Sequence, residues 1–213
     1  MKENYQLILN RTINEIQKNN IVPNLLLHSC CAPCSSYCIE YLSNYFNITL
    51  YFYNPNISYK EEFEKRANEL TRLINTMPLS RKVNLIIEHY DSNDFFEIAK
   101  GLENEPERGK RCEKCFYLRL DKSAQYAKRN NFDYFSTTLS ISPHKDAQLL
   151  NQIGKQISSI YNVFLIYNHI ILYFYYMILT ECLFTWQQIL IATGKPAMWV
   201  AYVSIFTANA VFL

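Results

Sequence analysis

The chain has 213 residues, of which 49% are apolar and 19% are charged. This length accommodates one α/β domain with a full hydrophobic core, and the composition excludes a disordered or fibrous protein. The formal net charge is only +2, so affinity for a nucleic acid would have to come from a local basic patch. Four glycines are too few for a glycine-rich phosphate-binding loop.

Short apolar runs alternate with amphipathic stretches along the first three quarters of the chain. Strands are predicted at 24–29, 48–53, 84–89 and 133–139, and helices at 35–45, 58–75, 91–100, 112–130 and 145–156. We expect Ser58, Asp91 and Asp146 to lie at helix starts. The strands are nearly continuous apolar runs, as in a parallel sheet that is buried on both faces. The sequence therefore predicts an α/β fold with a parallel sheet.

Residues with functional side chains follow three of the predicted strands. Cys30 and Cys31 follow the first strand, Asn54 follows the second, and residues 138–145 follow the fourth. In open parallel sheets, ligands bind beyond the carboxyl ends of the strands. We therefore expect the functional site at this edge of the sheet.

Seven cysteines are clustered in the sequence, at positions 30, 31, 34, 38, 112, 115 and 182. The first twenty residues are polar and lack the apolar core of a secretory signal, so we expect a cytoplasmic, reducing location. There, an odd and clustered set indicates metal binding or redox chemistry rather than disulfides. The strongest ligand candidates are Cys30, Cys31, Cys112 and Cys115, because two sequence-distant pairs of thiolates select zinc or an iron–sulfur cluster.

The other cysteines have different expected roles. Cys34 is either a further ligand or a thiol activated by a helix N-terminus. Cys38 lies at helical spacing beside apolar residues, so we expect it in the core. Cys182 is expected to be inert. His28 is either a hydrogen-bonding partner or acid at the cysteine site, or a buried structural histidine.

A basic segment spans residues 108–129, with eight Lys or Arg residues and two acidic ones. A polyanion such as tRNA would be attracted to this segment, and its binding would weaken with salt. A solvated helix face is the alternative, and the charge alone does not separate the two.

Four motifs, in order along residues 24–155, resemble those of the QueH-type epoxyqueuosine reductases. They are LLLHSCCAPCSSYCIEYL, YFYNPNI, GLENEPERGKRCEKCFYLRL and TTLSISPHKDAQLLNQIG. The resemblance implies a three-layer sandwich similar to the adenine-nucleotide alpha-hydrolase group, a Rossmann-like fold. It implies reduction of epoxyqueuosine to queuosine in tRNA, the last step of queuosine biosynthesis. It also implies a 4Fe-4S cluster on Cys30, Cys31, Cys112 and Cys115, with room for an additional iron ion.

Removal of an epoxide oxygen as water requires two electrons and two protons. The resemblance implies that a cluster relays electrons from an unidentified electron donor. A proton donor is also required near the oxygen. The candidates in this sequence are His28, Tyr53 and Lys145.

The C-terminal part departs from the family. Of 40 Lys, Arg, Asp and Glu residues, only two lie in residues 156–213, and the charged segment with a Cys-x-Cys pair that the resemblance implies is missing. We therefore divide the chain into a reductase domain, 1–158, and an atypical apolar tail, 159–213. A frameshift in an AT-rich gene explains the tail, and it would impair this chain as an enzyme. A membrane segment is the less favoured explanation. The apolar run 163–180 is only marginally long enough to span a bilayer, and it has almost no flanking charge to orient it.

Three other functions compete with the reductase. A zinc-stabilised module could bind RNA through the basic segment without reductase activity. An ATP-using tRNA thiolase would share the sheet, but the cysteine motif occupies the place of its phosphate-binding loop. A membrane-attached redox protein would need the tail as its anchor.

Overall fold

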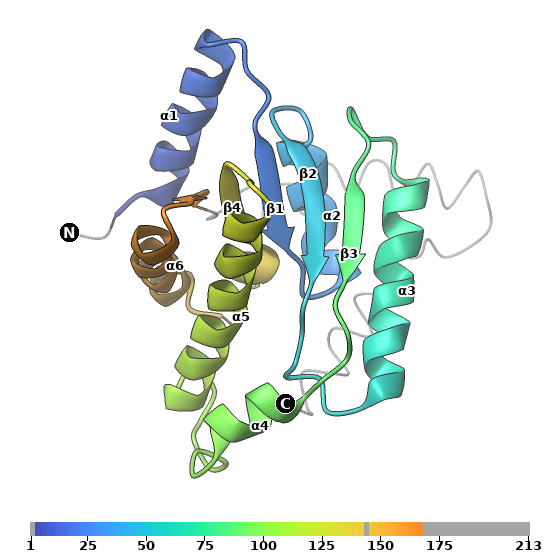
Figure 1. The fold of residues 1–213 in the computed structure, drawn as a ribbon, viewed down its shortest axis with the longest axis vertical. Coiled ribbons are helices and arrows are strands. Elements are labelled where there is room, and N and C mark those ends of the chain that lie inside the picture. Colours follow the sequence, from blue (N-terminus) through green and yellow to red (C-terminus); the bar gives the residue numbers. More distant parts are fainter. Residues whose placement is uncertain (1–2, 143–144, 168–213) are drawn as a thin grey trace, which may run out of the picture. The chain divides into compact units, whose positions relative to one another are not determined.

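The computed structural model describes residues 3–142 and 145–167, which form a five-stranded, all-parallel sheet with helices on both faces (Figure 1). The strand order is β3-β2-β1-β4-β5. The strands are β1 (Asn24–His28), β2 (Asn47–Phe52), β3 (Asn84–Ile87), β4 (Tyr134–Thr137) and β5 (Phe164–Leu165). The helices are α1 (Tyr5–Lys18), α2 (Ala32–Leu42), α3 (Lys60–Thr76), α4 (Asn93–Ala99), α5 (Lys110–Arg129) and α6 (Ala147–Tyr161), with a 3₁₀ turn η1 (Thr138–Ile141). The predicted parallel three-layer α/β fold is confirmed.

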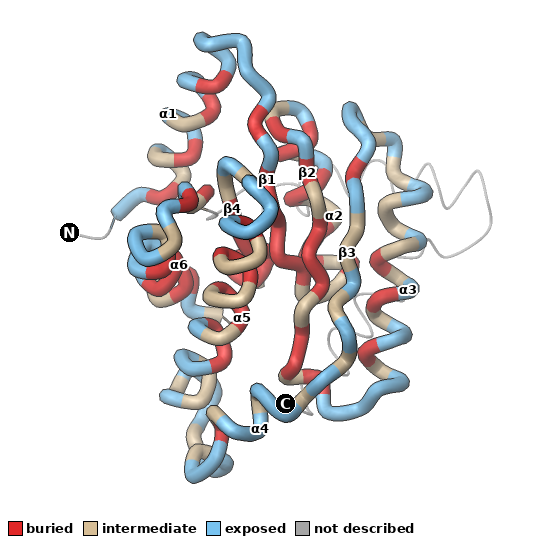
Figure 2. Tube along the Cα trace, viewed as in Figure 1, coloured by how far each residue is buried: buried red, intermediate tan, exposed pale blue. Residues whose placement is uncertain are grey.

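Each face of the sheet has its own hydrophobic core, because successive strand residues point to opposite faces. On β1, Leu25 and Leu27 pack with apolar residues of α1, α2 and α3. Leu26, between them, packs with apolar residues of α5 and α6. Figure 1 shows α5 in front of the sheet and α2 behind it, and Figure 2 shows the central strands buried between the two helical layers. Burial on both faces accounts for the continuous apolar runs of the strands.

The strand order changes direction at β1, which pairs with β2 on one side and β4 on the other. The chain leaves β1 through α2 to reach β2, whereas it reaches β4 through α5 on the opposite face. His28, the last residue of β1, lies in register with Tyr51 and Thr137. A crevice forms where connections diverge in this way, and ligands of open α/β sheets bind there.

Two elements were not predicted from the sequence. Helix α1 precedes the first strand and buries Leu9, Ile13 and Ile16 against the core shared with α2 and α3. Strand β5 lies within the segment that was assigned to the tail, and the Ile166 N–H donates to the Phe135 carbonyl at 2.9 Å. Helix α6 also continues to Tyr161, five residues beyond its expected end.

The three predicted helix starts differ in outcome. Helix α3 begins after Tyr59 without a side-chain cap, so the prediction of Ser58 as its N-cap is wrong. Helix α4 begins after Ser92, although Asp91 Oδ1 accepts from the Asn93 N–H at 2.8 Å. Asp146 is confirmed as the N-cap of α6, since its carboxylate accepts from two backbone N–H groups of the first turn.

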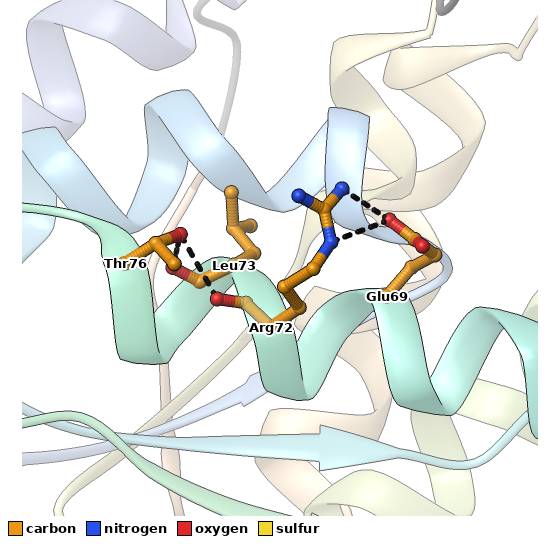
Figure 3. A network of polar contacts seen from close by, with 4 residues as sticks. All are labelled: Glu69, Arg72, Leu73 and Thr76. Atoms are coloured by element: carbon orange, nitrogen blue, oxygen red, sulfur yellow. Dashed lines mark hydrogen bonds and ion pairs between the residues drawn. The ribbon is translucent and has the colours of Figure 1, made fainter. Parts of the chain in front are cut away.

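Glu69, Arg72, Leu73 and Thr76 of α3 form a network of polar contacts within the helix (Figure 3). The Arg72 guanidinium donates to Glu69 Oε2 at 2.6 Å, one turn earlier. The Thr76 hydroxyl donates to the carbonyl oxygens of Arg72 and Leu73. Such i,i+3 ion pairs stabilise a helix by a few tenths of a kcal/mol. These contacts within the helix therefore support α3 itself.

Helices long and apolar enough to cross a bilayer are absent from the described residues. Most of the apolar run 163–180 lies outside that part of the chain, as do Cys182, Pro143 and His144.

Candidate metal centre

Three cysteine sulfurs converge at the carboxyl end of β1. The Sγ atoms of Cys30, Cys31 and Cys34 all lie within 4.8 Å of one another, and those of Cys30 and Cys31 are 3.6 Å apart. Within the described ranges, this is the one group of three or more metal-capable side chains that meets so closely. Thiolates in this arrangement are the donor set of zinc and of iron–sulfur clusters.

The sulfur atoms share their protons unequally. The Cys31 and Cys34 thiols donate to the Cys30 sulfur, which holds the pKa of Cys30 well below its usual range, and the Arg119 charge lowers it further. Donation to Cys30 raises the pKa of Cys31 to about 12 and also raises the pKa of Cys34. The Cys30 sulfur also lies 3.5 Å from Thr138 Oγ1. Metal binding requires thiolates, so it would displace the protons of these thiols.

Cys34, left open by the sequence, belongs to this group in the first turn of α2. Cys38, one turn later, is fully buried in the core under α2, as predicted. The helix begins three residues earlier than expected, at Ala32, and this earlier start places Cys34 inside it.

The second predicted ligand pair lies on α5. Cys112 is half-buried and Cys115 is buried, in the first two turns of the helix. Cys30 and Cys112 both pack against the apolar cluster that contains Phe116. One cysteine of each pair therefore borders the same cluster, although the sulfurs of α5 do not join the close group of three.

A buried polar cluster lies behind the cysteines. Arg119 is only 3% exposed, and its Nε donates to His28 Nε2 at 3.3 Å while its Nη2 donates to Asn54 Oδ1. Asn54 Nδ2 in turn donates to the Ser29 carbonyl at 2.9 Å. Arg119 was not predicted as a site residue, although its position four residues after Cys115 puts both on one face of a helix.

His28 is fully buried, and both ring nitrogens contact protein groups. Burial, with the Arg119 charge as a further cause, lowers its pKa to about 3, so the ring is neutral near pH 7. Nδ1 lies 2.8 Å from Thr137 Oγ1, and Nε2 lies 3.0 Å from the Tyr53 carbonyl oxygen. The Tyr53 contact requires a proton on Nε2, whereas the Arg119 contact requires a lone pair there. The Arg119 hydrogen bond is made when the proton is on Nδ1, and the Tyr53 hydrogen bond is made when it is on Nε2.

The other two candidate proton donors are more accessible. Tyr53 follows β2, is half-buried, and donates its hydroxyl proton to Asp94 Oδ2 at 3.0 Å. Burial and this carboxylate raise the pKa of Tyr53, so the phenol keeps its proton near pH 7. Lys145 Nζ lies 2.7 Å from Glu107 Oε1, an ion pair whose two side chains are 27% and 43% exposed.

The basic segment 108–129 does not form one continuous charged face. Arg119 is buried, and Lys122 Nζ lies 3.6 Å from Asp94 Oδ2. The exposed basic side chains of α5 lie at its two ends: Lys110, Lys114, Lys128 and Arg129. About 20 Å of helix separates the two pairs. The pair beside the cysteines is the one that could hold an anionic ligand at the site.

Comparison with known proteins identifies the family. The sequence model of the family described as epoxyqueuosine reductase QueH matches residues 25–171. The chain is 40% identical over 166 residues to epoxyqueuosine reductase QueH of Staphylococcus epidermidis, covering 76% of this chain and 70% of that protein. It is 39% identical over 162 residues to the same enzyme of Streptococcus pyogenes, covering 75% and 64%. The relative from Thermotoga maritima is 32% identical over 145 residues, covering 65% and 70%.

The chain thus spans about two thirds of the length of these relatives. The matched range contains the three converging cysteines, both cysteines of α5 and the buried Arg119 cluster. The chain belongs to the epoxyqueuosine reductase QueH family, a family of oxidoreductases of queuosine biosynthesis.

Proposed function

We propose that this chain reduces epoxyqueuosine to queuosine in tRNA, with a 4Fe-4S cluster held by Cys30, Cys31, Cys112 and Cys115. The observation that carries the proposal is the convergence of cysteine sulfurs at the carboxyl end of β1, where the sheet changes winding direction. Family membership supplies the substrate class, because the curated relatives are named for this reaction.

The donor set fits such a group. Cys30 is at the end of β1, and Cys112 and Cys115 are on the helix that packs over the same apolar cluster. All are thiols, which select iron–sulfur clusters or zinc over hard cations. When bound, a cluster supplies one-electron steps from an external donor. Cys34 is available beside Cys30 and Cys31 for an additional iron ion.

The residues around the cysteines have separate proposed tasks. Loss of the epoxide oxygen as water breaks both C–O bonds, forms the ring double bond, and consumes two electrons and two protons. Tyr53 and Lys145 are the proposed proton donors, because both carry transferable protons and reach solvent. His28 is buried with both nitrogens bonded. We therefore propose that His28 donates no proton to the substrate and instead positions Thr137 and Arg119.

A tRNA partner fits the exposed charge near the site. Lys110 and Lys114 lie in the first turns of α5, beside the half-buried Cys112. They would hold phosphates on either side of the modified nucleotide. Phosphate contacts of this kind make affinity fall with salt concentration.

The test is anaerobic purification of the full chain, followed by iron, sulfide and zinc analysis and a visible spectrum. About four iron atoms per chain with a broad visible band are expected. Dithionite is then the reductant in an assay on epoxyqueuosine tRNA, with loss of one oxygen detected by mass spectrometry. An external reductant is needed because each turnover consumes two electrons that the protein does not itself supply.

The matched variants separate ligands from bystanders. The double variant Cys112→Ala, Cys115→Ala is expected to lose the cluster and the activity, whereas Cys38→Ala keeps both. Full cluster content in the double variant would refute the ligand assignment.

A zinc-stabilised RNA-binding module is the second candidate function. The close approach of Cys30, Cys31 and Cys34 favours it, because a tetrahedral zinc site gathers thiolates around one ion. One zinc per chain without a visible band, together with RNA binding and no oxygen loss from the modified tRNA, would select this function over the reductase.

A further inference from the structure

Arg119 is a buried cation without a buried anion beside it. Its side chain is 3% exposed, and its two hydrogen-bonding partners, His28 and Asn54, are neutral. No carboxylate in the described part of the chain makes an ion pair with it. A guanidinium stays charged in proteins, and an uncompensated buried charge costs several kcal/mol. The fold must therefore offset this charge by another group.

The nearest anionic chemistry is the cysteine site. Arg119 bonds directly to His28, and through Asn54 to the Ser29 carbonyl, so it holds the two residues that precede Cys30. On its own helix, Arg119 lies four residues after Cys115, on the same face. It thus connects the two segments that carry the cysteine pairs.

We propose that Arg119 is the internal counter-cation and a positioning residue of the cysteine site. Its charge offsets the net negative charge of the thiolate-bound group. Its hydrogen bonds hold the cysteine-bearing face of α5 against the end of β1. The proposal rests on the proposed metal site, and it assigns Arg119 no contact with substrate.

A purely structural arginine makes a different prediction. It would stabilise the fold through its hydrogen bonds but leave the properties of the bound group unchanged. A nearby positive charge favours the reduced, more negative state of a cluster, so its removal makes reduction harder. The midpoint potential therefore distinguishes the two roles.

The experiment compares Arg119→Met and Arg119→Lys with wild type in anaerobically prepared full-length protein. Iron content is measured first, and the potential is then measured by redox titration. Arg119→Met is expected to shift the one-electron reduction equilibrium at least tenfold against reduction, or about 59 mV more negative. Arg119→Lys keeps the charge and is expected to stay close to the wild-type potential. Arg111→Met is the matched control, because Arg111 lies on the same helix with its guanidinium bonded to the Glu103 carbonyl near the surface.

An unchanged potential in folded, cluster-loaded Arg119→Met overturns the proposal. Should that variant fail to fold, Asn54→Asp tests the same charge, because it keeps an acceptor for Arg119 and adds a negative charge beside it. The same negative shift is expected, and an unchanged potential in Asn54→Asp again overturns the proposal.

Failure of the cluster assignment can be distinguished from failure of the Arg119 proposal. If the wild type holds zinc and no iron, the reductase proposal fails, and the variants are compared by the rate of zinc release to a chelator. Arg119→Met is then expected to release zinc at least tenfold faster than wild type or Arg111→Met. Equal release rates would refute the counter-cation role.

Discussion

The sulfur atoms of Cys30 and Cys31 lie 3.6 Å apart, although the residues are adjacent in the chain. Neighbours in a continuous strand point to opposite faces of the sheet. Convergence is achieved here because β1 ends at His28, and Cys31 is already the N-cap of α2. The strand-to-helix turn, rather than the cysteine spacing alone, builds the centre.

The same turn places the Cys34 sulfur beside those of Cys30 and Cys31. We expect Cys34→Ala to weaken metal binding tenfold or more, because its sulfur lies within 4.8 Å of those of Cys30 and Cys31. Cys38→Ala, one turn further along α2, should leave metal affinity unchanged, since Cys38 lies in the core. Competition with a chelator in the purified proteins measures both affinities. Equal affinities for the two variants would place Cys34 outside the metal site.

Tyr51 links stability to alkaline pH. Burial, with the neighbouring Glu88 carboxylate as a further cause, raises the pKa of Tyr51 above its usual value near 10. The groups that face it are Glu88, which accepts its hydroxyl proton, and the rings of Tyr53 and Tyr126. A raised pKa in the folded state means that stability is complete below pH about 10 and is lost as pH rises toward the folded pKa.

The free energy of unfolding of the wild type should therefore fall faster above pH about 10 than that of Tyr51→Phe. The slopes of unfolding free energy against pH for the two proteins should differ by up to about 1.4 kcal/mol per pH unit. Urea titrations at several pH values measure it. Tyr59→Phe is the control, because Tyr59 is 74% exposed and its curve should follow the wild type. Parallel curves for Tyr51→Phe and wild type would contradict this prediction.

Much of the fold was predictable because burial on both faces leaves a strong signal. The apolar runs of β1 and β2 could be placed to within a residue, since their alternating side chains enter two cores. Strand β5 has only two residues, Phe164 and Leu165, which is too short for a period to be recognised. It is recognised only by its pairing with β4.

The site was predictable in composition but not in contacts. The cysteine motifs identified Cys30 and Cys31, yet Arg119 was counted as part of a charged surface. A helical arginine is most often exposed, and the burial of Arg119 depends on His28 at the end of β1 and Asn54 in the loop after β2. Such long-range partners have no local signature in one sequence.

The N-cap of α6 is expected to contribute measurably to stability. Asp146 Oδ1 accepts from the Gln148 and Leu149 N–H groups, both at 3.0 Å. Asp146→Ala removes these contacts and should reduce the free energy of unfolding by about 1 kcal/mol. Arg72→Ala removes the exposed i,i+3 pair with Glu69, and loss of such a pair should cost about a few tenths of a kcal/mol. Thermal and urea unfolding compare the two, and equal losses would show that Asp146 is not an effective cap.

Residues 163–167 extend the sheet beyond residue 158, the predicted end of the reductase domain. Substitutions in this segment measure its contribution to the free energy of unfolding. Ile166 is 2% exposed and packs in the core shared with α1 and α2, and its carbonyl accepts from the buried Ser136 hydroxyl at 2.7 Å. Ile166→Ala should lower the free energy of unfolding by about 2–5 kcal/mol. Ile160→Ala is the matched control, because Ile160 is 62% exposed on α6 and its truncation should cost about 0.5 kcal/mol or less.

Urea unfolding of the two full-length variants, followed by circular dichroism, measures the difference. A large loss confined to Ile166→Ala would show that this segment is part of the folded core, because only a side chain packed there leaves a cavity when truncated. If Ile166→Ala and Ile160→Ala were equally stable, β5 would contribute nothing to the domain. The boundary of the reductase domain would then lie near residue 158, before the strand begins.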